Sequence, residues 1–147
     1  MELLFSKMHG CGNDYIVVDG RELNINWSNI ASVYCERNFS VGADGLLVVE
    51  TSDIAPIKMS MYNPDGSQAQ MCGNGIRCFT KFIIENSIVN LDNNELSIET
   101  LSGVLSVFPE IDSIGLVSTV RVSMGVPIFS PKNLPVSPSL SEFSQLD

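Results

Sequence analysis

YNPDGSQAQMCGNGIRC, residues 62–78, is the stretch that decides the fold of this 147-residue chain. Its first part contains Pro64-Asp65-Gly66, which is typical of a tight turn, so residues 63–67 are predicted to form a loop. Its second part opens a segment in which apolar residues recur at helical spacing. We therefore predict a helix over residues 76–87 that begins right after Cys72 and packs on a sheet. The apolar stripe of this helix consists of Ile76, Phe79, Phe82 and Ile83.

Strands are expected on both sides of this helix along the chain. Apolar and alternating segments predict strands at 3–8, 15–18, 46–49 and 57–62 before it, and at 96–100, 104–108 and 116–124 after it. A second helix is predicted from Ser28, as its N-cap, to about residue 37. Ile30, Val33 and Tyr34 are expected on its buried face. This mixture of elements indicates a mixed α/β (α+β) fold class.

The domain organisation changes near residue 127. Residues 1–127 are expected to form one domain, because 44% of the chain is hydrophobic and can supply a core. Residues 128–147 are rich in proline and serine, which interrupt regular elements, and are predicted to be a linker. No closing element follows this linker before Asp147, so we expect a second domain outside these residues.

The charge and hydropathy of the chain exclude several classes of partner. A formal net charge of −9 argues against nucleic acid and anionic membrane surfaces, which select clustered Lys and Arg. No apolar run approaches the roughly 20 residues of a membrane span. Residues 1–10 lack the pattern of a secretion signal. We expect a cytoplasmic protein that acts on a small molecule.

The four cysteines, Cys11, Cys35, Cys72 and Cys78, are expected to be thiols, because the cytoplasm is reducing. The chain has no CxxC pair, and its one histidine, His9, has no partner at a usual ligand spacing. No metal site and no cofactor motif are predicted. Cys35 and Cys78 fall on predicted helices and are expected to fill core space.

Cys72 carries the sharpest chemical signal. The positive end of the following helix favours a thiolate there. The unpaired backbone N–H groups of Gly73 and Asn74 offer a seat for a carboxylate. An amino acid docked there would present its α-carbon to the sulfur, which suits proton abstraction. An acyl-transfer nucleophile is a poorer interpretation, because it needs an oriented histidine. A purely structural small residue in a tight loop is the remaining alternative.

Four segments resemble the diaminopimelate epimerase family in order and spacing: KMHGCGNDY at 7–15, GADGLL at 42–47, the stretch 62–78, and VSMGVP at 122–127. The resemblance covers nearly the whole chain. It implies one of two pseudo-symmetric halves, each a mixed sheet wrapped around a central helix, facing each other across a cleft. One cysteine from each half would act on opposite faces of the substrate α-carbon, with no cofactor and no metal.

The resemblance also implies roles for individual residues. Cys72 matches the catalytic cysteine of the first domain, and Gly73 and Asn74 match the amides that hold the reacting carboxylate. Asn13 and Asn63 match side chains that contact the substrate, the latter at its distal end. Cys11 stands where many relatives have leucine and is expected to be a packing variant.

Three functions remain open. The first is epimerisation of LL- to meso-diaminopimelate by a protein of which this chain is one half, inactive alone because it lacks the second cysteine. The second is racemisation of another amino acid on the same fold. The third is a non-catalytic carboxylate-binding domain. Self-association into a homodimer is a further hypothesis, because an apolar face meant for a second domain would be exposed.

Overall fold

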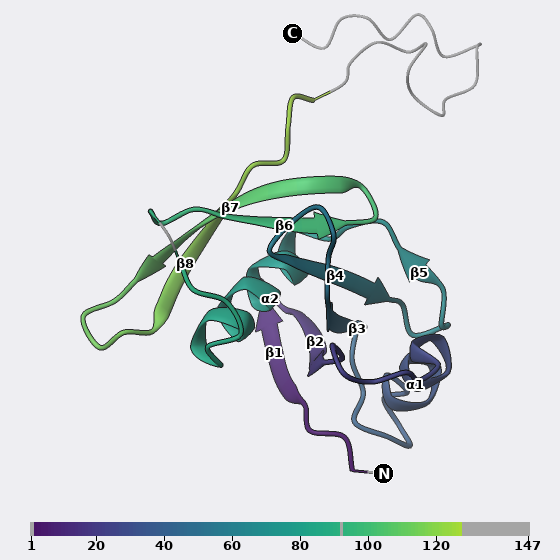
Figure 1. Ribbon diagram of the computed structural model, residues 1–147. Helices are drawn as coiled ribbons and strands as arrows, with labels where there is room; N and C mark the ends of the chain where they lie inside the picture. The colour runs from purple at the N-terminus through teal and green to yellow at the C-terminus, as the bar shows by residue number, and fades with distance from the viewer. Residues whose placement is uncertain (1, 92, 128–147) are drawn as a thin grey trace, which may run out of the picture.

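Strands of the computed structural model, which describes residues 2–91 and 93–127, form one mixed sheet (Figure 1). The order is β1-β2-β3-β4-β6-β7-β8, with β5 paired to β4. The pairs β2–β3 and β4–β6 are parallel, and the others are antiparallel. The strands are β1 (Ser6–Gly10), β2 (Asn13–Asp19), β3 (Gly45–Glu50), β4 (Ile57–Tyr62), β5 (Gln68–Ala69), β6 (Leu96–Thr100), β7 (Gly103–Ile111) and β8 (Val117–Val122); the helices are α1 (Trp27–Tyr34) and α2 (Gly73–Glu85).

Helix α2 lies inside the curl of the sheet. Both end strands of the sheet, β1 and β8, contact α2, as do β2, β3 and β7 between them. Figure 1 shows the strands arranged around this helix. A flat sheet could not bring both of its ends to one helix, so the sheet is a half-barrel. The predicted fold, a mixed sheet wrapped around a central helix, is confirmed.

The apolar stripe of α2 is buried as predicted. Ile76, Phe79 and Ile83 are fully buried, and Phe82 retains 8% exposure. Burial of each such side chain contributes about 1.5–3 kcal/mol relative to leaving it in water. This burial fixes the rotation of α2 about its axis and therefore where its first residue lies.

Alternation along the central strands gives the sheet two apolar faces. On β2, Tyr15 and Val17 pack in the core that contains α2, while Ile16 and Val18 pack in a second core with α1. The register pairs Tyr15 with Gly45 and continues residue by residue along β3, whose side chains alternate in the same way. Because successive side chains point to opposite faces, Tyr15 points toward α2.

Helix α1 begins two residues earlier than predicted, ends at Tyr34 and not near residue 37, and has a different cap. The side chain of Asn26 accepts a hydrogen bond from the Asn29 N–H at 3.1 Å, so Asn26 is the N-cap. The predicted cap, Ser28, instead donates its hydroxyl to the carbonyl of Gly66 at 2.7 Å. The prediction of Ser28 was wrong because both residue types cap helices well, and tertiary contact with the loop after β4 decided between them.

The buried face of α1 also differs from the prediction. Trp27 and Ala31 on α1, with Cys35 directly after it, occupy the core. Val33 is 50% exposed and Tyr34 is 44% exposed. The spacing from 27 to 31 to 35 is helical, but alanine and cysteine are weak apolar signals, and the larger side chains on the other face outweighed them in the sequence pattern.

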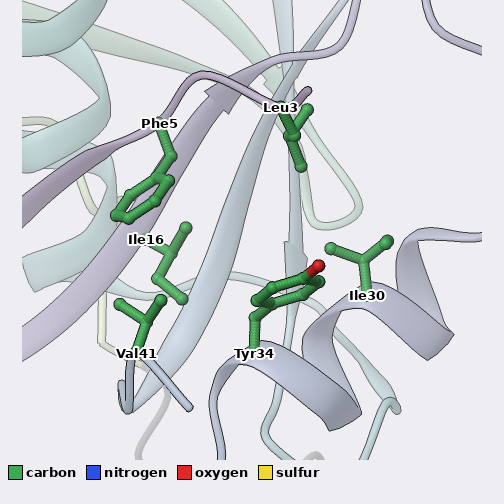
Figure 2. A pocket seen from close by; sticks show the side chains of 6 residues that line it. All are labelled: Leu3, Phe5, Ile16, Ile30, Tyr34 and Val41. Atoms are coloured by element: carbon green, nitrogen blue, oxygen red, sulfur yellow. The ribbon is translucent and has the colours of Figure 1, made fainter. Parts of the chain in front are cut away.

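A surface pocket lies between α1, the sheet and the chain before β1, as Figure 2 shows. Ile30 and Tyr34 contribute from α1, and the chain before β1 lies opposite them. The remaining lining residues are Leu3, Phe5, Ile16 and Val41. Of the three side chains expected in the core, Ile30 and Tyr34 thus line a hollow at the surface, and Ile30 is partly buried and also packs against the core beside α1.

Most other boundaries agree closely with the sequence, but β1 begins at Ser6, three residues later than predicted. The strand predicted at 57–62 coincides with β4, and α2 begins at Gly73, directly after Cys72. The loop after β4 is closed by a hydrogen bond from the Gly66 N–H to the Asn63 carbonyl at 2.9 Å. The two-residue strand β5 was not predicted. The predicted linker, residues 128–147, lies outside the described residues.

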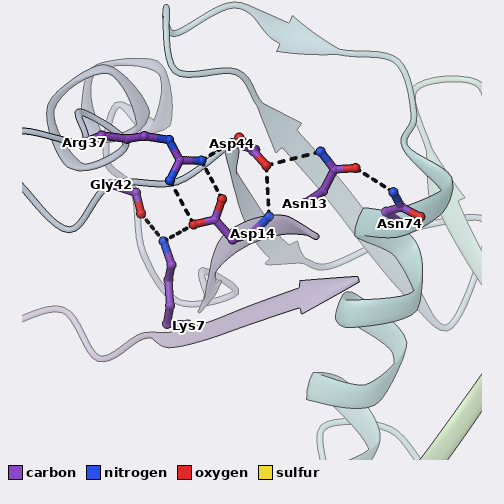
Figure 3. Close-up of polar contacts among 7 residues, drawn as sticks. All are labelled: Lys7, Asn13, Asp14, Arg37, Gly42, Asp44 and Asn74. Atoms are coloured by element: carbon purple, nitrogen blue, oxygen red, sulfur yellow. Dashed lines mark hydrogen bonds and ion pairs between the residues drawn. The ribbon is translucent and has the colours of Figure 1, made fainter. Parts of the chain in front are cut away.

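A cluster of charges ties the first two strands to the loop before β3 (Figure 3). The carboxylate of Asp14 pairs with Lys7 at 2.7 Å and with Arg37 at 2.6 Å, and Arg37 also pairs with Asp44 at 2.6 Å. Lys7 also donates to the carbonyl of Gly42. Hydrogen bonds from Arg37 and Lys7 hold the pKa of Asp14 well below its usual range.

We predict that Phe79→Ala lowers the free energy of unfolding by about 3–5 kcal/mol, because it leaves a cavity between α2 and the sheet. Phe39→Ala is the matched control. Phe39 is 92% exposed, so its loss should change stability by less than about 0.5 kcal/mol. Urea unfolding followed by circular dichroism measures both. Equal effects of the two substitutions would contradict the central position of α2.

The charge cluster predicts a stability that falls in acid. The pKa of Asp14 is lower in the folded protein than in the unfolded protein, where it is about 4. The ionised carboxylate therefore stabilises the fold fully above about pH 4, and this stability is lost as the pH falls toward the pKa of the folded protein. Asp14→Asn should therefore lose less stability than the unmodified chain between pH 5 and pH 3. Asp53→Asn, at an exposed carboxylate, should keep the original slope. Urea midpoints at a series of pH values test this, and parallel curves for all three proteins would refute it.

Candidate active site

One edge of the sheet collects most of the residues singled out by the sequence. The parallel strands β2 and β3 start there, since Tyr15 pairs with Gly45, and the antiparallel strand β4 ends there, since Leu46 pairs with Tyr62. Asn13 at the start of β2 and Asn63 directly after β4 are therefore brought to the same edge. Neighbouring strands lie about 4.8 Å apart, so these two asparagines are separated by roughly 10 Å across β3.

Cys72 is the N-cap residue of α2. Its backbone is extended, with φ −142° and ψ 121°, and its carbonyl accepts the first helical hydrogen bond from the Ile76 N–H at 2.9 Å. Within the described part of the chain its side chain makes no capping hydrogen bond. The thiol is half-buried. The Cys72 side chain thus does not cap the helix, and the residue is partly exposed to solvent.

The sulfur of Cys72 has a close polar neighbour that the sequence did not predict. The hydroxyl oxygen of Tyr15 lies 3.0 Å from Cys72 Sγ. Tyr15 is 1% exposed, and burial, followed by the contact with Cys72, raises the pKa of its phenol far above the ordinary range. In the sequence Tyr15 reads only as one apolar residue of an alternating strand, which is why it was missed.

The first turn of α2 is fixed to the sheet by asparagine side chains. Asn74 Nδ2 donates to Asn13 Oδ1 at 2.6 Å, and Asn13 Nδ2 donates to Asp44 Oδ2 at 3.2 Å (Figure 3). Arg77 donates to the Asn74 side-chain oxygen and, at 3.2 Å, to the Gly73 carbonyl. The polar chain from Asp44 to Arg77 orients both asparagines.

The backbone N–H groups of Gly73 and Asn74 belong to the first turn of α2, where no carbonyl of the same helix can accept from them. Both residues are partly exposed. Acidic side chains are absent from this first turn. An anion placed beside Cys72 would therefore meet unpaired donors and the positive end of the helix dipole.

Asn63 takes part in its own turn. Its side chain donates to Ser67 Oγ at 3.0 Å, and its backbone N–H donates to the Ser67 carbonyl at 2.8 Å. The residue is half-buried. The structure therefore brings Cys72, Asn13, Gly73 and Asn74 together, with Asn63 on the same edge but outside their hydrogen-bonded group.

The other cysteines differ from Cys72 in environment. Cys35 and Cys78 are 2% and 5% exposed, which confirms that they fill core space, and burial raises the pKa of Cys35 to about 11. Cys11 is exposed in the turn between β1 and β2, with φ 52°. Its prediction as a packing variant was wrong, because this turn carries the side chain outward, where its sulfur accepts from Arg77 at 3.3 Å.

His9, on β1, is exposed. Among residues 2–91 and 93–127, no group of three or more His, Cys, Asp or Glu side chains is placed to hold a metal ion. No helix in the same residues is long and apolar enough to cross a membrane.

Solved structures share this fold at low sequence identity. A methylitaconate-delta-isomerase superposes with a TM-score of 0.62 at 16% identity, covering 79% of this chain and 36% of that protein. A probable proline racemase from Agrobacterium radiobacter K84 gives 0.61 at 16% identity, covering 82% and 41%. A PhzF-family protein from Bacillus anthracis gives 0.58 at 23% identity, covering 77% and 36%. These similarities establish the fold alone.

Sequence comparison is more specific. The family profile described as "Diaminopimelate epimerase" matches residues 5–129. The diaminopimelate epimerase of Caldanaerobacter subterraneus subsp. tengcongensis is 47% identical over 140 residues, covering 95% of this chain and 49% of the relative. That of Halothermothrix orenii is 45% identical over 141 residues, covering 93% and 48%. The chain spans about half the length of these curated relatives, and it belongs to the diaminopimelate epimerase family.

Proposed function

We propose that residues 1–127 form the first of two domains of an enzyme that interconverts LL- and meso-diaminopimelate, with Cys72 as the acid–base group on one face of the substrate. The observation that carries this proposal is the position of Cys72, half-buried at the N-cap of α2 beside the donors of Gly73 and Asn74. Membership in the diaminopimelate epimerase family supports the substrate.

The proposed reaction moves one proton at a time. The substrate α-carboxylate accepts hydrogen bonds from the N–H groups of Gly73 and Asn74, which places the α-carbon next to Cys72 Sγ. The thiolate of Cys72 takes the α-proton and becomes a thiol, and the carbanion's charge spreads into the carboxylate held by those N–H groups. A second cysteine, from the second domain, returns a proton to the opposite face. In the reverse direction the two thiols exchange roles.

Asn13 and Asn63 are proposed to contact the substrate. Asn13 is held between Asn74 and Asp44, so its amide is already oriented before a ligand binds. Asn63 lies on the far side of β3, a separation of roughly 10 Å that suits the distal amino-acid group of diaminopimelate. Its hydrogen bond to Ser67 is exposed and can be exchanged for one to a ligand.

The proposal includes the chemical setting of the protein. The mechanism uses no pyridoxal phosphate and no metal, because the two sulfurs and the backbone donors supply all the proton transfers and charge stabilisation. The four cysteines are free thiols, and a reducing cytoplasm keeps them so. Substrate choice rests on the relatives at 41–47% identity, which are diaminopimelate epimerases. A racemase of another amino acid would bind the same α-carboxylate.

We predict that Cys72→Ser lowers epimerase activity at least about 100-fold in the two-domain protein, because a hydroxyl is too weak a base for this proton transfer. Cys11→Ser, the same substitution at an exposed thiol outside the site, should keep most of the activity. A coupled assay of meso-diaminopimelate formation measures both. Full activity of Cys72→Ser would remove Cys72 from the mechanism.

A second prediction concerns the need for two domains. In deuterated water, LL-diaminopimelate should gain deuterium at its α-carbon with the two-domain protein but not with residues 1–147 alone, because without the second domain the site is open to water, which weakens each electrostatic contact with the substrate. Nuclear magnetic resonance or mass spectrometry of the recovered amino acid gives the answer. Epimerisation by residues 1–147 alone would disprove the two-cysteine arrangement. Tight binding of diaminopimelate without exchange would instead favour a carboxylate-binding domain.

A further inference from the structure

The hydroxyl of Tyr15 is a buried polar group that the proposed reaction does not yet use. It lies 3.0 Å from Cys72 Sγ, and the Tyr15 side chain reaches it from β2 through the core, with 1% of the residue exposed. The two residues are 57 positions apart in the sequence. This contact is therefore made by the fold, where α2 begins over the start of β2.

Two glycines lie beside the Tyr15 ring. A Cβ atom at Gly75 would lie 3.6 Å from Tyr15 Cζ, 3.5 Å from Cys72 Cβ and 3.3 Å from a methyl of Leu47. A Cβ at Gly45, the strand partner of Tyr15, would lie 3.7 Å from Tyr15 Cδ1 and 3.0 Å from the Tyr62 carbonyl. The distances to the ring are those of ordinary van der Waals contact, so both glycines border the ring, and the tighter distances are to Leu47 and Tyr62.

The direction of the hydrogen bond depends on the state of the sulfur. When Cys72 is a neutral thiol, either group can donate. When Cys72 is a thiolate it has no proton, so the phenol must donate. Burial raises the pKa of Tyr15 well beyond that of a free phenol, so the phenol keeps its proton near neutral pH. A thiolate at Cys72 would thus have a protonated donor 3.0 Å away.

We propose that Tyr15 is a positioning residue for Cys72, whose buried hydroxyl donates to the thiolate, increases its population near neutral pH and fixes the direction of the sulfur. This inference rests on the proposed role of Cys72 as the acid–base group. The hydroxyl does not touch the substrate carbon. It acts through the sulfur by keeping one side of the thiolate occupied, which leaves the other side for the α-proton.

The test is the pH dependence of alkylation of Cys72 by iodoacetamide. Only the thiolate reacts, so the rate reports the thiolate population. Trypsin places Cys72 in peptide 59–77 and Cys78 in peptide 78–81, so mass spectrometry follows each thiol separately. Tyr15→Phe removes only the hydroxyl. We expect its Cys72 to react about three- to tenfold more slowly at pH 7, with the rate curve moved to higher pH.

Tyr34→Phe is the matched control, because Tyr34 lies on α1, at the pocket of Figure 2 and outside the core cluster that contains Tyr15 and Cys72. It should leave the Cys72 curve in place. An unchanged curve in Tyr15→Phe would overturn the proposal. Urea midpoints show whether Tyr15→Phe is folded, and reaction of the buried Cys35 would reveal unfolding.

If Tyr15→Phe does not fold, a replacement of nearly the same size still tests the role of Tyr15. Incorporation of 3-fluorotyrosine in a chain that carries Tyr34→Phe and Tyr62→Phe leaves one fluorinated phenol, at position 15, that is a stronger donor. The Cys72 curve should then move to lower pH, and no movement would count against Tyr15.

Kinetics of the two-domain protein give an independent readout. Tyr15→Phe should lower kcat with KM nearly unchanged, because the substrate is held by backbone donors and not by the phenol. The acid limb of its profile of activity against pH should move to higher pH. An increase in KM alone would argue for a structural role. If Cys72→Ser proves active while Tyr15→Phe still moves the alkylation curve, the proposed function fails and the contact between the two residues stands.

Discussion

Burial of α2 within the curled sheet is the constraint on which the rest of the molecule depends. Burial of Phe79 and Ile83 sets the rotation of α2 about its own axis. Contacts with both β1 and β8 set its position inside the half-barrel. With the orientation set, the first turn of α2 arrives over the start of β2. Cys72, Asn74 and Asn13 are therefore assembled by core packing, and the polar contacts among them refine a position already chosen.

Much of this arrangement could be predicted from the sequence, and the reasons differ between elements. α2 and β4 carry strong periodic patterns with turn residues beside them, so their bounds were close. The cap and the buried face of α1 were missed, because Ser28 and Asn26 are equivalent local signals and Ala31 is a weak apolar one. β5 consists of two residues and has no pattern of its own.

The residues of the candidate site also differ in how far the sequence predicted them. Cys72, Gly73 and Asn74 stand next to one another in a distinctive motif, and family resemblance added Asn13 and Asn63. Tyr15 has no local signal, because its hydroxyl matters only where β2 passes under α2, a contact across 57 positions. Arg77 and Asp44 likewise gain their place only through the chain of hydrogen bonds that the fold closes. A sequence pattern does not predict which distant polar residues will contact a short motif, because the fold makes those contacts.

At position 72, the residue types that best stabilise the helix N-cap differ from the thiol that the proposed proton transfer requires. Serine, threonine, asparagine or aspartate at an N-cap stabilises a helix by about 1 kcal/mol relative to a residue that does not cap, and Cys72 makes no such bond. The start of α2 is therefore less stable than its backbone allows. With Cys72 as the acid–base group proposed above, selection for turnover would keep a thiol there against that preference. In a lineage released from catalysis, this one codon would be expected to drift toward a hydroxyl or carboxylate side chain while the rest of the half-barrel stayed the same.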